Sequence, residues 1–194
     1  MLETPRRRAI EDAASTLFRE RGYAATSIRD IAQALAIRGP SLYAHVTSKE
    51  EVLWAIVDRA ARRFEEAAAS AAAEPARSAV DRLQNLVRAH VRAIATDPGE
   101  AMVFVAEWRH LTDDRKANVL DRRDAYEARF RALIADGMAD GTFALTDPAI
   151  AATFLLSALN GIATWYRLDG RLPADRIADH YAELTTRSLS EAHR

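Results

Sequence analysis

Apolar residues in this chain recur at intervals of three and four positions, and this spacing most restricts the folds open to it. The clearest examples are Ile10, Ala13, Ala14, Leu17 and Phe18, and further along Val80, Leu83, Val87, Val91 and Ile94. Such a period places apolar side chains on one face of an α-helix, whereas a half-buried strand alternates every second residue. No alternating run of useful length is present. The spacing therefore predicts an all-α fold.

Capping and helix-breaking residues divide the chain into about nine expected helices. Thr4-Pro5 opens the first, Gly22 ends it, and Ser48 with Glu51 predicts a capping box for the fourth. The expected ranges are roughly 5–21, 27–35, 40–46, 48–70, 75–96, 100–111, 112–141, 147–170, and 173 nearly to the C-terminus. With 7 Gly and 6 Pro in 194 residues, turn-formers are too scarce for a β-rich chain.

Composition excludes several classes of protein. The balance of 49% hydrophobic and 28% charged residues is that of a globular domain, and the absence of cysteine excludes disulfides and thiolate metal sites. The charged start has no apolar signal region, so we expect a cytoplasmic protein. Residues 149–166 carry no charge. However, Thr153, Ser157, Asn160 and Thr164 align on one helical face, which favours a buried helix over a membrane span.

Two short helices joined by a tight turn, at residues 27–35 and 40–46, are arranged as in a helix-turn-helix. The second would enter the major groove of DNA, with Ile31 and Leu35 packing on Leu42 to fix the crossing angle. Arginine can read guanine, serine can meet a base edge, and tyrosine and lysine suit phosphates. The candidate DNA-binding residues are Thr26, Ser27, Arg38, Gly39, Ser41, Leu42, Tyr43, His45 and Lys49. Net charge gives little support for DNA binding, because the whole chain has a net charge of −1.

The run from Gly22 to Leu53 resembles the DNA-binding domain of the TetR/AcrR family of transcriptional regulators. The matching positions are Gly22, Thr26, Ile28, Ile31-Ala32, Leu42-Tyr43, Ser48-Lys49-Glu50 and Leu53. Ala36 stands where the family usually has a turn glycine, Val46 replaces an aromatic residue, and Pro40 stiffens the entrance to the second helix. The resemblance implies a regulator that binds a palindromic, double-stranded DNA operator.

The resemblance also implies three parts: a helix-turn-helix domain over 1–50, a connecting helix over 51–74, and a helical-bundle ligand-binding and dimerisation domain over 75–194. The two long apolar helices at the end of the chain would pair with those of a second copy in a homodimer. We expect the connecting helix to transmit the response to ligand. The polar stripe of Thr153, Ser157, Asn160 and Thr164 can face either the ligand or the dimer contact.

Residues 102–143 and 159–172 are similar to a TetR subgroup of repressors of fatty-acid, phenylacetate and steroid-ring degradation that respond to acyl-CoA thioesters. Such a ligand needs cations for its phosphates and an apolar site for its acyl chain. The candidate ligand-binding residues are Phe104, Trp108, Arg109, Arg122, Arg123, Tyr126, Phe130, Asn160 and Trp165. The arginines also fit a solvated, salt-bridged face beside Asp121, Asp124 and Glu127.

Several alternatives stay open at this point. A drug-like molecule or a free fatty acid is an alternative effector, and the sequence does not decide between repressor and activator. A metal-dependent helical-bundle enzyme is the rival class, because Glu107-x-x-His110 is half of a di-metal motif. Its second half is missing, so we expect no catalytic residues, no metal and no cofactor.

Overall fold

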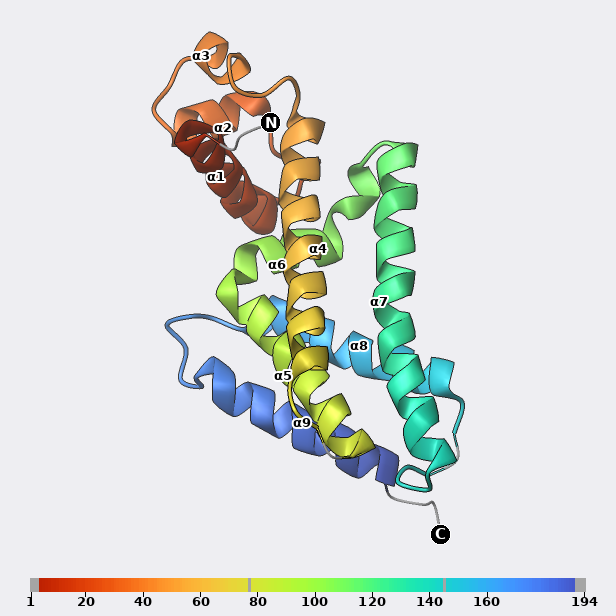
Figure 1. The fold of residues 1–194 in the computed structure, drawn as a ribbon. Helices are drawn as coiled ribbons and strands as arrows, with labels where there is room; N and C mark the ends of the chain where they lie inside the picture. The colour runs from red at the N-terminus through yellow and green to blue at the C-terminus, as the bar shows by residue number, and fades with distance from the viewer. Residues whose placement is uncertain (1–3, 77, 145, 191–194) are drawn as a thin grey trace. The chain divides into compact units, whose positions relative to one another are not determined.

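The computed structural model describes residues 4–76, 78–144 and 146–190, and these residues form nine α-helices, one short 3-10 helix and no strand. The all-α prediction is confirmed. The helices, drawn in Figure 1, are α1 (Pro5–Arg21), α2 (Ile28–Ala34), α3 (Gly39–Tyr43), α4 (Lys49–Ala73), α5 (Ala79–Thr96), α6 (Pro98–Ala106), η1 (Trp108–His110), α7 (Asp113–Ala139), α8 (Pro148–Trp165) and α9 (Ala174–Ser190). The outer ends of the domains predicted over 1–50 and 75–194 fall outside the described residues.

Both predicted ends of α1 are confirmed. The Thr4 hydroxyl oxygen accepts a hydrogen bond from the Arg7 amide at 3.3 Å, and Pro5 occupies the first helical position. Gly22 ends the helix with φ 81°, a left-handed conformation that glycine adopts without steric cost, and its amide donates to the Phe18 carbonyl at 2.9 Å. Local capping chemistry therefore sets the limits of this helix.

Several other helix ends differ from their predicted positions. α5 begins at Ala79 rather than near Pro75, because Ser78 and Asp81 form a complete capping box. α3 ends at Tyr43 rather than Val46, and α6 ends at Ala106, after which the chain tightens into η1. α8 ends at Trp165, where Tyr166 turns extended (ψ 136°), rather than at the Asp169-Gly170 pair.

The capping box predicted for α4 is only half present. The Ser48 hydroxyl oxygen accepts from the Glu51 amide at 3.0 Å, as expected. The Glu51 carboxylate, however, accepts from the Thr47 amide at 2.6 Å and from the Arg7 guanidinium at 2.8 Å. This carboxylate joins α4 to α1 instead of closing the box on Ser48.

The chain divides into two compact units, which are discontinuous in sequence. The first comprises the described residues of Met1–Ala61 with Gly99–Leu120, and the second those of Arg62–Pro98 with Asp121–Arg194. α4 and α7 contribute residues to both. The division into domains over 1–50, 51–74 and 75–194 stays a prediction. It assigns a role to each part of the chain, whereas the two compact units are defined by their internal contacts.

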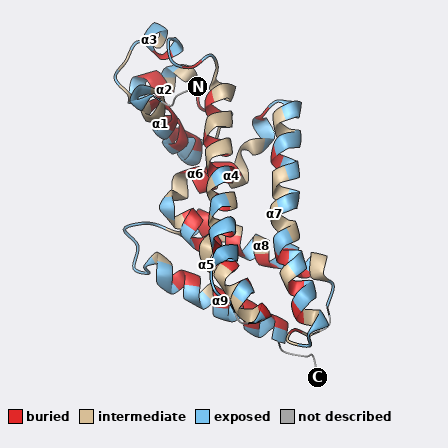
Figure 2. Cartoon of the chain, viewed as in Figure 1, coloured by how far each residue is buried: buried red, intermediate tan, exposed pale blue. Residues whose placement is uncertain are grey.

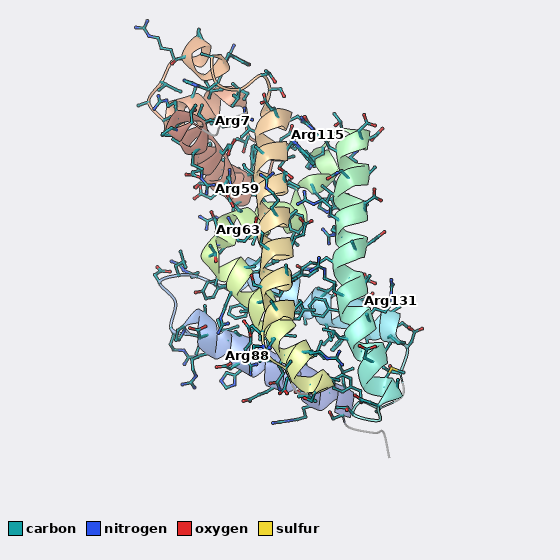
Figure 3. The ribbon with its side chains drawn as sticks, in the orientation of Figure 1. Arg7, Arg59, Arg63, Arg88, Arg115 and Arg131 are labelled. Atoms are coloured by element: carbon teal, nitrogen blue, oxygen red, sulfur yellow. The ribbon has the colours of Figure 1, made fainter. Side chains whose placement is uncertain are left out.

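The first unit buries an ion-pair network beneath its helix-turn-helix. Glu11 on α1 and Glu100 on α6 are 2% and 1% exposed, and both accept hydrogen bonds from Arg59 on α4. Nε of Arg59 lies 2.7 Å from Oε1 of Glu100. Figure 3 shows Arg7 and Arg59 projecting from α1 and α4. Because a buried charge is costly without a partner, the network fixes how these three helices pack.

In the second unit, α5 packs on α8 and α9. The buried side chains of this core include Leu83, Val87, Ile94, Phe130, Leu159, Ile162 and Ile177. Polar pairs border the α5–α9 contact: Nε of Arg88 donates to Asp179 at 2.8 Å, and Nε of Arg92 donates to Asp175 at 3.0 Å. The apolar stripe predicted for α5 is thus the side that α8 and α9 cover.

α8 leaves one continuous face uncovered in the single chain. We call this the exposed α8 face; its residues are Ile150, Thr153, Phe154, Ser157, Ala158, Thr164 and Trp165. Figure 2 colours the chain by burial, with buried residues red and exposed residues pale blue. By length and composition α8 is the one helix in the described part of the chain that could cross a membrane, with 33% of it buried in the fold.

The polar stripe predicted to be buried lies largely on this exposed face. Thr153, Ser157 and Thr164 are exposed, and Asn160 is partly buried. The Ser157 hydroxyl donates to the Thr153 carbonyl at 2.7 Å, and the Thr164 hydroxyl donates to the Gly161 carbonyl at 2.7 Å. These bonds within the helix satisfy the hydroxyl donors of Ser157 and Thr164, which lowers the cost of covering this face with apolar atoms.

Candidate DNA-binding surface and effector site

The helix-turn-helix is built from α2, a tight turn and α3. Ser27 and Asp30 form a full capping box at the start of α2. In the turn, the Ile37 amide donates to the Ala32 carbonyl at 3.0 Å, and Ala36 takes φ 51°. The left-handed region disfavours alanine because of its Cβ atom. The turn therefore keeps a glycine-like conformation, although the residue is alanine.

α3 and the residues on either side of it expose most of the side chains expected to read DNA. Arg38, Ser41, Tyr43 and His45 are exposed, and Gly39 is the first residue of the helix. Leu42 is fully buried and holds α3 in place. The exposed set carries a guanidinium, a hydroxyl, a phenol and an imidazole, which together supply donors and acceptors for base edges and phosphates.

Two other candidates are engaged within the protein. Thr26 is 1% exposed, and its hydroxyl donates to the Gly22 carbonyl at 2.9 Å. Ser27 is exposed, but its hydroxyl donates to the Asp30 carboxylate at 2.6 Å. In this conformation Thr26 and Leu42 support the DNA-binding surface from within.

Lys49 joins the start of α4 to the loop between α1 and α2. Its ammonium donates to the Tyr23 carbonyl at 2.8 Å and to the Thr26 carbonyl at 2.7 Å, and it lies 4.0 Å from the centre of the Tyr23 ring. Burial lowers the pKa of this ammonium. An ammonium has three donors, so one remains for a phosphate.

The candidate ligand-binding residues are divided between the two units. Phe104, Trp108 and Arg109 belong to the first. Phe104 is buried, and the Arg109 guanidinium lies 5.0 Å from the Trp108 ring centre. In the second unit, Asn160 is partly buried, and Trp165 is 48% exposed at the end of the exposed α8 face. Trp165 is therefore not enclosed in the core of the single chain.

Tyr126 and Phe130 on α7 lie together, 5.8 Å apart by ring centres, as expected for neighbours one helical turn apart. They meet Phe64 of α4 and His90 of α5, which the sequence reasoning missed. We call these four residues the aromatic cluster. The signal for His90 was available: it lies three residues after Val87, on the apolar face of α5.

His90 is the polar centre of the aromatic cluster. It is 2% exposed, and its Nδ1 lies 3.1 Å from the Tyr126 hydroxyl oxygen. Burial lowers the pKa of His90 to about 3, so its imidazole is neutral at physiological pH, and burial raises the pKa of Tyr126. Among the described residues, none supplies a hydrogen-bond partner for Nε2 of His90.

The arginines one turn before Tyr126 are partly committed to the protein. Arg122 makes a two-pronged pair with Glu65, with Nε to Oε1 at 2.6 Å and Nη2 to Oε2 at 2.9 Å. Arg123 is partly buried. Arg122 is thus in a salt bridge, although with Glu65 rather than with the neighbouring Asp121, Asp124 or Glu127, and a phosphate at this position would have to compete with Glu65.

Glu107 and His110, the residues of the metal half-motif, lie 3.4 Å apart by Oε2 and Nε2. Within residues 4–76, 78–144 and 146–190, no group of three or more His, Asp or Glu side chains is placed to hold a metal ion. His110 instead stacks on Tyr23, with ring centres 5.1 Å apart.

Comparison with known proteins extends the resemblance to the whole chain. Residues 10–56 match the family described as bacterial regulatory proteins, tetR family, and residues 76–189 match the family described as tetracyclin repressor-like, C-terminal domain. The HTH-type transcriptional repressor KstR2 of Rhodococcus jostii is 30% identical over 97% of this chain and 93% of its own length.

Solved structures agree with this assignment. A tetR-family regulatory protein from Rhodococcus RHA1 superposes with a TM-score of 0.86 at 29% identity, covering 98% of this chain and all of its own. AibR in complex with isovaleryl coenzyme A and operator DNA superposes with a TM-score of 0.80 at 29% identity, covering 92% of this chain and 97% of AibR. The chain belongs to the TetR family and is a DNA-binding, ligand-responsive transcriptional repressor of that family rather than an enzyme.

Proposed function

We propose that two copies of this chain bind a palindromic operator and release it when an acyl-CoA thioester binds. The observation that carries the DNA-binding part is α3 with the residues on either side of it, where Arg38, Ser41, Tyr43 and His45 are exposed while Leu42 anchors the helix in the core. Half-sites about 34–36 Å apart, or a multiple of this, fit two such helices in one dimer.

Gel retardation with the promoter region of its own gene tests operator binding. Arg38→Ala should weaken binding about 10- to 100-fold, as expected for the loss of a two-pronged guanine contact. Arg131→Ala is the matched control, because Arg131 is exposed on α7 and pairs only one turn away with Glu127. Equal affinity of both variants would remove Arg38 from the proposed contacts.

The homodimer is proposed from the exposed α8 face and from α9, both of which pack on α5. Ile150 and Phe154 are 69% and 63% exposed on α8, and Leu184 is 59% exposed on α9. Large apolar side chains clustered on a surface mark an interface, and a second copy can cover them with the same face. Covering α8 in this way also favours a cytoplasmic dimer over a membrane-spanning chain.

Light scattering after gel filtration tests the dimer. The wild-type protein should have twice the mass of one chain, and Phe154→Asp should give the mass of one chain. Leu120→Asp is the control, because Leu120 is also a large exposed apolar residue, at 45%, but lies on α7. A Phe154→Asp protein that stays dimeric would contradict this interface.

The acyl-CoA effector is supported by the similarity to AibR, whose structure holds isovaleryl coenzyme A, and by the aromatic cluster, which suits an acyl chain. Arg109, Arg122 and Arg123 stay candidates for the phosphates. The ligand would favour a dimer with wrongly spaced reading helices, and its differential affinity for the two geometries sets the loss of DNA binding. α4, which continues from one compact unit into the other, is the proposed transmitting element.

Release of the retarded operator complex tests the effector. Isovaleryl-CoA or a longer acyl-CoA should release the operator, whereas free CoA should not. A drug-like compound or a free fatty acid is the second candidate, favoured by the pairing of Arg122 with Glu65. Release by a free fatty acid, with no response to its CoA ester, would replace the thioester by that alternative.

A further inference from the structure

The aromatic cluster holds a polar atom that its surroundings leave unsatisfied. His90 is 2% exposed, and the ring centres of Phe64, Tyr126 and Phe130 lie 4.9, 5.7 and 6.4 Å from the centre of its imidazole. The described residues pair Nδ1 with Tyr126 and provide nothing for Nε2. Buried polar atoms without partners are rare, because each one costs the hydration it has lost.

Counting the hydrogen atoms shared by His90 and Tyr126 identifies whether Nε2 is a hydrogen-bond donor or an acceptor. A neutral imidazole carries one proton, on either nitrogen. If the Tyr126 hydroxyl donates to Nδ1, the proton is on Nε2 and a single N–H is left without an acceptor. If Nδ1 donates to Tyr126 instead, both the phenolic hydrogen and the lone pair of Nε2 lack partners. The first arrangement leaves fewer unsatisfied groups, so Nε2 is a hydrogen-bond donor.

We propose that the Nε2–H group of His90 donates a hydrogen bond to a carbonyl oxygen of the effector, whose apolar part packs on the aromatic cluster. This inference rests on the proposed function in taking the effector to bind in this unit. The required chemistry is an acceptor oxygen attached to an apolar group. The thioester carbonyl of an acyl-CoA and a ketone on the acyl chain both provide it.

His90 also has the properties of a selective recognition group. Tyr126 fixes its tautomer and ring orientation through one hydrogen bond, and the neighbouring rings exclude water from it. A site built to pair a buried polar group rejects analogues that lack the matching atom, because the group then stays unpaired. The protein should therefore distinguish ligands of equal shape by a single oxygen.

Matched ligands test this directly. Cyclohexanone and methylenecyclohexane are similar in shape and differ in the carbonyl oxygen, and octanoyl-CoA and its S-octyl thioether differ in the same way. His90→Asn keeps a polar atom near Nδ1 and removes the Nε2 donor, whereas His90→Gln keeps a donor near Nε2. The preference for the carbonyl member of each pair should fall about 10-fold in His90→Asn and persist in His90→Gln. An unchanged preference in His90→Asn would overturn the proposal.

Nitrogen-15 NMR of the wild-type protein gives an answer that does not depend on any variant folding. Cyclohexanone should shift the Nε2 resonance of His90 and slow the exchange of its hydrogen, and methylenecyclohexane should do neither. Equal responses to the two, or no response to cyclohexanone and octanoyl-CoA alike, would refute the hydrogen bond.

One pair of matched ligands contains CoA and the other does not, so comparing their results separates this inference from the proposed function. If cyclohexanone pairs with His90 while no acyl-CoA releases the operator, the effector class is wrong and the role of His90 stands. If acyl-CoA releases the operator and the carbonyl preference does not depend on His90, the proposed function stands and this inference fails. Comparing octanoyl-CoA with 3-oxo-octanoyl-CoA then distinguishes the thioester carbonyl from a chain ketone.

Discussion

Gly137 and Phe143 lie so close together that a Cβ atom on Gly137 would come within 2.2 Å of Cδ2 of the phenylalanine ring. The Phe143 amide also donates to the Gly137 carbonyl at 2.8 Å, which folds the chain after α7 back over the helix. Phe143 is 3% exposed, so its ring has little room to move. Glycine is needed here for packing rather than for backbone conformation.

We expect Gly137→Ala to destabilise the protein by about 2 kcal/mol, because the added methyl group must displace a buried ring. This exceeds the gain of roughly 0.5–1 kcal/mol that alanine usually brings inside a helix. Urea unfolding measures the change. Gly39→Ala is the control, since a Cβ there would meet nothing within 4 Å, and it should stay within about 0.5 kcal/mol of wild type. A neutral Gly137→Ala would contradict the packing.

Ala36→Gly should stabilise the protein. Ala36 has φ 51°, which costs a non-glycine residue about 1–2 kcal/mol. Glycine removes this cost but loses more backbone entropy on folding, by roughly 0.5–1 kcal/mol, so the net gain is about 0.5–1 kcal/mol. Thermal unfolding should show a higher Tm. Ala34→Gly, at an exposed helical position two residues earlier, should lower it, and the same sign for both variants would argue against strain at Ala36.

Arg59→Met should be destabilising by about 3 kcal/mol, because the buried Glu11 and Glu100 would lose their shared cation and keep only Arg7 and Arg8, respectively. The comparison is Arg19→Met. Arg19 is half exposed and pairs with Glu20 at 4.0 Å, a contact worth about 0–1 kcal/mol at most. Chemical unfolding of both variants should separate them clearly. If Arg59→Met lost no more than Arg19→Met, the network would contribute nothing to the packing of α1, α4 and α6.

His90 should make stability depend on pH. Its folded-state pKa of about 3 lies below its ordinary value of 6.5, so between these values the unfolded chain binds a proton that the folded chain refuses. Stability from this group is therefore present above pH 6.5 and is lost as the pH falls. Between pH 7 and pH 5 the loss is about 2 kcal/mol.

The measurement is urea unfolding of the wild type and His90→Gln at pH 7 and pH 5. The variant lacks the titrating imidazole, so its free energy of unfolding should fall by about 2 kcal/mol less than that of the wild type over this interval. Equal losses in the two proteins would mean that His90 is not kept neutral by burial.

Much of the fold follows from local rules that a sequence displays openly. The Thr4-Pro5 start, the Gly22 stop and the Ser27 cap each act within a few residues, and the structure places all three as expected. The start of α5, which differs from its predicted position, has the same kind of cause. Ser78 and Asp81 form a capping box that outweighs Pro75, and this pair was visible in the sequence but was not used.

The candidate DNA-binding residues could be identified from the sequence only as a group. The helix-turn-helix pattern identified α3, because the spacing and the capping residues of this pattern lie close together in the sequence. Which of the candidate residues are exposed depends on packing: Leu42 and Thr26 are buried, while Arg38 and Tyr43 are exposed. The exposed fraction of a side chain is set by neighbours that come from α1 and α4, which the pattern within α3 does not contain.

The sequence by itself determined the helical class, most caps and the family, since these depend on residue types at short spacing. Tertiary structure alone decided that Arg59 joins Glu11 to Glu100, that Phe143 requires Gly137, and that His90 meets Tyr126. Two of these contacts link residues far apart in the chain, and the third depends on a return of the chain after α7. Their energies come from burial, which exists only once distant helices have packed around them.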